Sequence, residues 1–172
     1  MFALEPDEAN RRHLEALVGD NKKVRIDVRG VSDQSRKGVP FFASDVSTGI
    51  SSLSNFHDTH RQTQTIDLTS LRDFVEEMQI EKIDFLKTDI EGHDLFALRG
   101  VPWERVHPDC IVSEYEDRKT KKNGYDTADM YEFLTSRGYE VVISEWFPIE
   151  EYGRHHRWKA FRRSPNEIDP AS

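Results

Sequence analysis

The sequence predicts an α/β protein whose mainly parallel sheet is covered by helices on both faces. Short apolar segments typical of buried strands alternate along the chain with segments of helical spacing. The alternation continues without an internal repeat, and 172 residues are enough to bury one sizeable core. We therefore expect one domain over residues 1–163, followed by a C-terminal tail over residues 164–172.

The first quarter of the chain holds three expected strands and one expected helix. A strand at residues 2–4 leads into a helix that starts near Pro6 and stops at Gly19. Proline fits the first turn of a helix and glycine commonly follows the last. Apolar and charged residues then alternate in a strand from residue 24 to about residue 33, and residues 39–42 form another.

The segment at residues 43–64 is rich in Ser, Thr, Asp and His and predicts a long surface loop. Loops of this length inside a compact domain are often functional. His57 and His60 could place an imidazole over the neighbouring strand ends. We take His57 as a candidate general base, against the alternative that it is simply solvated.

The rest of the chain continues the same alternation and ends in a pair of strands. Cys110, the single cysteine, lies in an apolar run and is expected to be a buried structural thiol. The expected elements are strands at residues 65–68, 83–86, 110–112, 139–143 and 158–161, and helices at about residues 70–78, 92–98 and 127–137.

Charge and hydropathy limit the partners that this chain can have. The net charge is −8, whereas phosphate binding needs concentrated positive charge. No apolar run reaches the roughly 20 residues that span a bilayer. We expect no nucleic-acid or membrane partner, but a small molecule or another protein. One cysteine and the lack of a signal-peptide pattern suit a cytoplasmic location.

The strongest functional signal is the segment at residues 83–92. An apolar strand delivers Asp89 and Glu91 into the turn at its carboxyl end, and Gly92 permits a close backbone there. Ligands of open α/β sheets bind outside the carboxyl ends of strands. Carboxylates at this place can accept a hydroxyl proton, hold a cation or orient an ammonium group. The alternative is that Asp89 only caps the next helix.

Acidic residues also end two earlier strands. Glu5 stands between a strand and a helix, where doubly wound folds bind ribose hydroxyls, although a charge at a helix start explains it equally well. Ser32 and Asp33 end the next strand, and Asp33 could accept from an adenine amino group. The same two residues also suit an ordinary turn.

Other catalytic and metal patterns are missing from the sequence. It contains no Cys pair, no His-Glu-x-x-His, no Gly-x-Ser-x-Gly and no glycine-rich phosphate loop. We therefore predict no metal site. Glu114 ends the strand at residues 110–112 and faces the same edge as Asp89, so a hard cation held by Asp89, Glu114 or His57 stays an open alternative.

Taken in order, three stretches resemble the FkbM family of S-adenosylmethionine-dependent methyltransferases. They are residues 2–6, residues 31–33, and above all residues 83–95 together with residues 98–100. The resemblance extends over about residues 1–161, and the part from Lys87 to Gly100 is the most specific.

The resemblance implies a class I methyltransferase fold, a Rossmann-like seven-stranded sheet that is mostly parallel with an antiparallel last strand. It implies S-adenosyl-L-methionine as cofactor and O-methylation of a hydroxyl on a sugar or another small metabolite. Glu5 would bind the ribose, and Ser32 and Asp33 would lie beside adenine. Asp89 and Glu91 would border the methionine part of the cofactor and the acceptor, with Asp89, Glu91 and His57 as the catalytic candidates.

The chain departs from the family at its start. Family members begin with a strand and an Asp-x-Gly-x-x-x-Gly turn, whereas Met1 already lies in what would be the second strand. The resemblance thus implies that the first strand and the glycine-rich loop are lacking, in a fragment of a longer protein or a shortened relative. We expect weak cofactor binding or none.

Two other functions stay open. An inactive Rossmann-like remnant could serve as a protein-association module through its open sheet edge, and would then form homo-oligomers. A nucleotide-sugar or dinucleotide binder could use Glu5, but the sequence has no glycine fingerprint for it.

Overall fold

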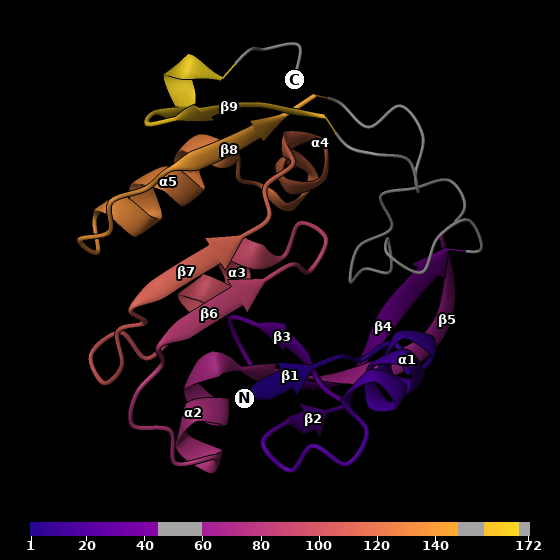
Figure 1. Cartoon of the computed structure of the whole chain (residues 1–172). Helices are drawn as coiled ribbons and strands as arrows, with labels where there is room; N and C mark the ends of the chain where they lie inside the picture. Colours follow the sequence, from indigo (N-terminus) through magenta and orange to yellow (C-terminus); the bar gives the residue numbers. More distant parts are fainter. Residues whose placement is uncertain (45–59, 148–156, 169–172) are drawn as a thin grey trace. The chain divides into compact units, whose positions relative to one another are not determined.

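The computed structural model describes residues 1–44, 60–147 and 157–168 (Figure 1). The chain divides into two compact units, residues 1–114 and residues 115–172. Each unit has its own strands and helices and is described separately below. In the described part of the chain, no helix has the length and the hydropathy to cross a lipid bilayer.

The first unit opens with a strand, a helix and a parallel strand. β1 (Phe2–Leu4) pairs in parallel with β2 (Arg25–Asp27), and α1 (Glu8–Val18) connects them. The Asp7 carboxylate caps α1 by accepting from two backbone N–H groups of its first turn at 2.9 and 3.0 Å. The predicted strand at residues 2–4 and the following helix are confirmed, although none of the residues of α1 is fully buried.

The single strand expected over residues 24–33 is wrong, because the chain breaks it after β2. Asp27 Oδ1 accepts the backbone N–H of Arg29 at 2.9 Å, and Asp27 Oδ2 accepts from its guanidinium at 2.7 Å. This local bonding competes with the strand ladder and turns the chain. The next strand, β3 (Gly30–Ser32), therefore joins another sheet.

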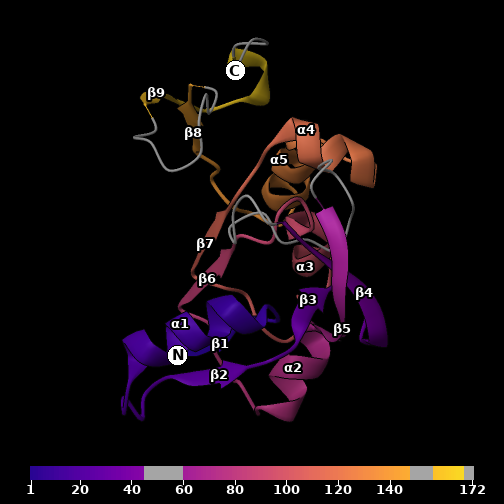
Figure 2. The same ribbon diagram turned by 90° about the vertical axis from the view of Figure 1, so that its right-hand side faces the viewer.

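That second sheet has the strand order β3-β5-β4 (Figure 2). β3 runs parallel to β5 (His60–Ser70), and β4 (Arg36–Ser44) runs antiparallel to β5. The outer residues of β4 and β5 lie in the segment that the sequence predicts to be a loop. A small core forms on this sheet from Phe41, Ile66 and Leu68.

A third sheet carries the segment with the strongest functional signal. β6 (Phe85–Thr88) and β7 (Cys110–Ser113) pair in parallel. Two helices, α2 (Leu71–Glu77) and α3 (Asp94–Arg99), lie before β6 and between β6 and β7. The main core of this unit contains Leu71, Val75, Val101 and Val106, with Leu86 packed against it.

One face of the β6–β7 pair is exposed, and the prediction of a buried Cys110 is wrong. Side chains alternate between the faces of a strand, so Cys110 and Val112 share one face. Cys110 lies opposite Phe85, and all three side chains are exposed. The inward face carries Leu86 and Ile111 instead. An apolar run alone does not say which of its residues point inward.

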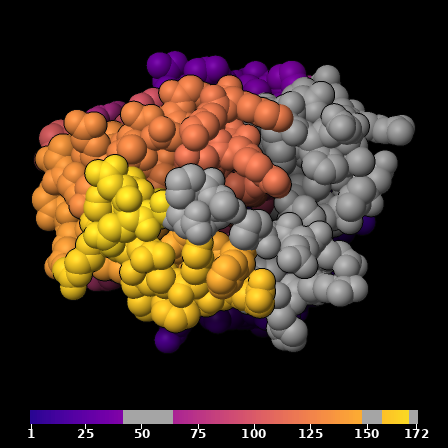
Figure 3. All heavy atoms as spheres, turned by 90° about the horizontal axis from the view of Figure 1, so that it is seen from above, coloured from indigo at the N-terminus to yellow at the C-terminus, as the bar shows by residue number. Residues whose placement is uncertain are grey.

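The second unit contains helices and one antiparallel strand pair. In Figure 3 the yellow atoms of residues 157–168 lie against the orange atoms of residues 115–147. The predicted last strand is confirmed at residue 158, whereas its partner begins four residues later than expected. The elements are α4 (Asp117–Thr120), η2 (Lys121–Asn123), α5 (Thr127–Thr135), β8 (Ile143–Trp146), β9 (Trp158–Arg162) and η3 (Pro165–Glu167).

A buried ion cluster joins β8 to β9. Glu145 is 0% exposed and pairs with Lys159 Nζ at 3.0 Å and with Arg162 Nε at 2.7 Å. Removing Arg162 takes away one of these two cations from the buried carboxylate. We expect Arg162→Met to lower the free energy of unfolding by about 1–2 kcal/mol, the size of a hydrogen bond to a charged group. Urea unfolding measures this change.

The neighbouring Arg163→Met is the matched control. Arg163 pairs with Glu140 at 2.9 Å, and both side chains are about four-fifths exposed. Exposed pairs contribute at most about 1 kcal/mol. Equal effects of the two substitutions would show that the buried pairing at Glu145 adds nothing.

The described elements confirm a mixed α/β protein. Their strands pair in four separate sheets of two or three strands each, and three of the four pairings in the first unit are parallel. Both β1 and β6 are hydrogen-bonded to a neighbouring strand on one side only. One continuous Rossmann-like sheet stays a prediction.

Candidate functional site

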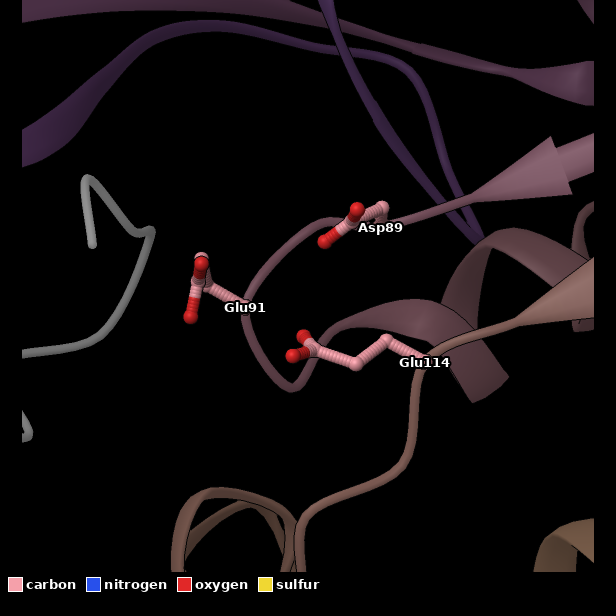
Figure 4. Close-up of side chains that lie close together, drawn as sticks. All are labelled: Asp89, Glu91 and Glu114. Atoms are coloured by element: carbon pink, nitrogen blue, oxygen red, sulfur yellow. The ribbon is translucent and has the colours of Figure 1, made fainter. Parts of the chain in front are cut away.

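Three carboxylates meet at the carboxyl ends of β6 and β7. Asp89 follows β6 directly, Glu91 lies in the turn after it, and Glu114 follows β7 (Figure 4). The parallel pairing brings the strand ends together, and the Glu114 backbone N–H donates to the Thr88 carbonyl at 3.2 Å. One oxygen of each carboxylate lies within 4.8 Å of the other two.

The turn after β6 holds Glu91 in an uncommon backbone conformation. Glu91 has a φ of 56° and Gly92 a φ of 88°, so two consecutive residues are left-handed. Glycine adopts this conformation freely, whereas a glutamate there is uncommon. Figure 4 shows the Glu91 side chain on the tip of the turn, with Asp89 and Glu114 on either side of it.

A lysine pairs with one of the three carboxylates. Lys87 Nζ lies 2.7 Å from Asp89 Oδ2, and both side chains are about half exposed. An exposed pair of this kind contributes at most about 1 kcal/mol.

A fourth carboxylate, Asp94, lies next to this group at the start of α3. Its side chain is 1% exposed, and neither oxygen accepts a hydrogen bond of regular geometry from the described residues. The pKa of Asp94 is raised to about 6, mainly by burial and also by the charges of Glu114 and Asp89, while the nearby Thr88 hydroxyl acts to lower it. That hydroxyl is itself hydrogen-bonded with Ser113 Oγ at 2.8 Å.

Glu5 occupies the carboxyl end of β1, as predicted. Its Oε1 accepts the Asp7 backbone N–H at 2.8 Å, and Oε2 makes no hydrogen bond with the described residues. Burial raises the pKa of Glu5, an effect that the hydrogen bond from Asp7 and the nearby Arg11 oppose. A half-buried carboxylate with a free oxygen at a strand end fits a ligand that offers hydroxyl donors.

Ser32 and Asp33 lie at the end of β3, close to the turn after β6. Ser32 is buried, and its Oγ donates to Asp33 Oδ1 at 3.1 Å. The charge of Asp33 acts on His93, whose pKa is lowered mainly by burial of the ring. Asp33 is thus near the residue that precedes α3, in the same part of the unit as the acidic group.

The structure therefore brings together only part of the predicted site. Asp89 and Glu91 converge with Glu114, and Asp33 lies beside His93, whereas the contacts of the Glu5 carboxylate are with Asp7 and Arg11. The candidate base His57 lies outside the described residues. Which of these residues act in catalysis or in cofactor binding stays a prediction.

Asp94 and His93 are the residues that the sequence argument did not select. Both belong to the specific motif at residues 87–100. An aspartate in the first turn of a helix usually only complements the helix dipole. This ordinary explanation gives no reason to expect that Asp94 is buried. The sequence does contain a signal for the burial of Asp94. The carboxylates of the preceding turn come before it, and two apolar residues of α3 follow it.

Comparison with known families gives one match. The family model described as the methyltransferase FkbM domain matches residues 1–141, more than four-fifths of the chain. No curated protein and no solved structure matches the chain. The match includes all of β1 to β7, and with them the acidic group, Glu5 and Asp33.

Proposed function

Because the chain belongs to the FkbM methyltransferase family, we propose that it transfers a methyl group from S-adenosyl-L-methionine to a hydroxyl of a small molecule. The observation that carries the proposal is the placement of acidic side chains at the carboxyl ends of parallel strands. Glu5 follows β1, Asp33 follows β3, Asp89 follows β6 and Glu114 follows β7. Ligands of α/β sheets bind at the carboxyl ends of their strands.

In this proposal each residue has a separate task. The Glu5 carboxylate accepts hydrogen bonds from the ribose hydroxyls, and Ser32 and Asp33 lie beside the adenine. When bound, the cofactor supplies a methyl group on a sulfonium sulfur, which passes to the acceptor oxygen and leaves a neutral thioether. Asp89 or Glu91 accepts the proton of the acceptor hydroxyl, with His57 as the third candidate base.

The acidic group also suits the proposed acceptor. Carboxylates are hydrogen-bond acceptors only, so they select partners that donate, such as the hydroxyls of a sugar or a related metabolite. Holding the acceptor oxygen in line with the methyl group contributes most of the rate in a reaction of this kind. A small hydroxyl compound, rather than a nucleic acid or a membrane lipid, is the proposed substrate.

Cofactor binding is the test of this proposal. We expect saturation-transfer NMR, which detects weak complexes, to show transfer from the chain to the ribose and adenine protons of S-adenosyl-L-homocysteine. Glu5→Gln keeps the shape of the side chain but removes its charge. We expect it to weaken binding about tenfold, since charge-assisted hydrogen bonds to hydroxyls contribute about 1.4 kcal/mol.

Glu8→Gln is the control for Glu5→Gln. Glu8 is exposed in the first turn of α1 and pairs with Arg12, three residues from Glu5. The Glu8→Gln substitution removes the same charge close to Glu5, and we expect no change in the affinity for S-adenosyl-L-homocysteine. If S-adenosyl-L-homocysteine receives no saturation from the chain, or if both variants weaken binding equally, Glu5 is not a cofactor ligand.

A protein-association role is the second candidate, and one observation favours it. Phe85 and Val112 are 59% and 46% exposed on the same face of the β6–β7 pair. Exposed apolar side chains on adjoining strands commonly mark an interface. Light scattering distinguishes this candidate: a concentration-dependent dimer that Phe85→Ser abolishes supports it, whereas a monomer at all concentrations contradicts it.

A further inference from the structure

We infer that Asp89, Glu91 and Glu114 form a binding site for a hard divalent cation, with Asp94 as an inner carboxylate beside it. This site is independent of the proposed methyl transfer, since it requires only the first unit to fold as described. The sequence offers no metal-binding motif, and the site arises because the parallel pairing of β6 and β7 places the ends of both strands together.

The separation of the ligand atoms suits such an ion. Three carboxylate oxygens lie within 4.8 Å of one another. Calcium binds oxygen at about 2.3–2.6 Å, so two ligands on opposite sides of one ion are about 4.6–5.2 Å apart and adjacent ligands are closer. One ion can therefore contact all three oxygens after a small movement of the carboxylate side chains, with the strands in place.

Asp94 is an independent indication that positive charge belongs here. Its side chain is almost completely buried, neither oxygen has a regular hydrogen-bond donor among the described residues, and it interacts electrostatically with Glu114 and Asp89. A buried carboxylate without a partner is costly unless a cation or a proton compensates it. Its position at the start of α3 lets it act on the ion directly or through a coordinated water.

The charges of the neighbourhood agree with this assignment. Asp89, Glu91, Glu114 and Asp94 carry up to four negative charges, and Lys87 pairs with Asp89. Lys87 and Asp89 are half exposed, so this pair can separate when an ion enters at little cost. Asp89 is exposed, whereas Glu91 and Glu114 are partly buried, so water or a hydroxyl of a ligand can complete the coordination from the Asp89 side.

Titration of the full 172-residue chain with Mn²⁺ tests the site. Free Mn²⁺ is measured by its electron paramagnetic resonance signal, which is lost on binding. We expect one ion per chain, displaced by Ca²⁺, and an affinity at least tenfold lower in Glu114→Gln. Asp94→Asn should also weaken binding, because it removes the inner charge without removing a ligand of the three.

Asp84→Asn is the matched control. Asp84 lies directly before β6, is exposed and pairs with Lys82, so the substitution removes one negative charge from the same unit at the other end of β6 from the cluster. We expect its affinity to equal that of the unsubstituted chain. Equal weakening in Asp84→Asn and Glu114→Gln would mean that Mn²⁺ only collects at an acidic surface, and that result would overturn the inference.

A replacement variant and a second contradicting result complete the test. If Glu114→Gln does not fold, Asp89→Asn takes its place, since the Asp89 side chain is half exposed and its loss costs little stability. No Mn²⁺ bound at millimolar concentration would also overturn the inference. Titrating S-adenosyl-L-homocysteine with and without chelator separates the two proposals, because either ligand can bind when the other does not.

Discussion

Replacing Gly100 by alanine is expected to lower the free energy of unfolding by about 3 kcal/mol, at the upper end of what overpacking costs. The new Cβ would lie 2.7 Å from the Ser32 carbonyl oxygen, 3.2 Å from that of Ala97 and 3.3 Å from the Leu71 nitrogen. All three are backbone atoms, so none can rotate away. The φ of −74° is ordinary for alanine, and the cost therefore comes from the contacts alone.

The same contacts connect this glycine to the candidate site. Gly100 ends α3, its carbonyl accepts the Arg72 backbone N–H at 2.7 Å, and the end of β3 passes over its α-carbon. A Cβ there must push away Ser32 and with it Asp33. We therefore expect Gly100→Ala to weaken binding of any ligand that contacts Asp33, even where the protein still folds.

Gly30→Ala is the matched comparison for guanidinium unfolding. Gly30 is also buried, but its Cβ would meet the tips of Leu68 at 2.8 Å and Ile66 at 3.0 Å, which are side-chain atoms. Those tips can change rotamer, so we expect a loss nearer 1 kcal/mol. If Gly30→Ala were the more destabilising change, the backbone contact at Ser32 would not be what requires glycine at residue 100.

The elements that sequence predicted best are those whose signals are local. Pro6, Gly19 and the acid between them define α1 through its caps, and the apolar residues before Asp89 define β6. The carboxylates at the ends of strands can also be predicted locally, because the sequence shows a parallel strand together with the turn that ends it. Asp89 and Glu91 were found in this way.

The wrong predictions share a different cause, since these features depend on side-chain contacts and on which face of a strand is buried. The break after Asp27 results from its bonds with Arg29, and the exposure of Cys110 results from which face of β7 turns inward. Neither is visible in a propensity or an apolar run. The pairing of Glu145 with Lys159 and Arg162 across β8 and β9 is likewise a property of strand register.

Asp94→Asn is expected to make the protein more stable than the unsubstituted chain above pH 6 in buffer that contains chelator. The pKa of Asp94 is raised from 3.8 to about 6, so between these values the folded state binds more protons than the unfolded state. Stability from this group is thus greatest at low pH and is lost as pH rises toward 6. The full loss is about 3 kcal/mol, at 1.36 kcal/mol for each pKa unit.

An asparagine at this position carries no charge at any pH, so the variant lacks this slope. Thermal unfolding from pH 4 to pH 8 measures the effect as the difference between the two proteins, which cancels the other groups that titrate in this range. Asp89 and Glu114 face Asp94 and raise its pKa, while the Thr88 side chain lowers it. Asp84→Asn, which changes an exposed carboxylate, should keep the slope of the unsubstituted chain.

The sign of this difference is what makes the experiment informative. An aspartate that stabilises the fold through an ion pair has a lowered pKa, and its loss destabilises the protein most at neutral pH. Asp94 is expected to do the opposite, because it is buried beside two other carboxylates and no cation among residues 1–44, 60–147 and 157–168 is paired with it. A variant that is less stable than the unsubstituted chain at pH 8, with an unchanged slope, would show that Asp94 is charged and well paired. If Asp94 is instead unpaired, as we expect, Ca²⁺ should reduce the difference in stability between the unsubstituted chain and Asp94→Asn. The reason is that an ion at Asp89, Glu91 and Glu114 favours the charged form of Asp94.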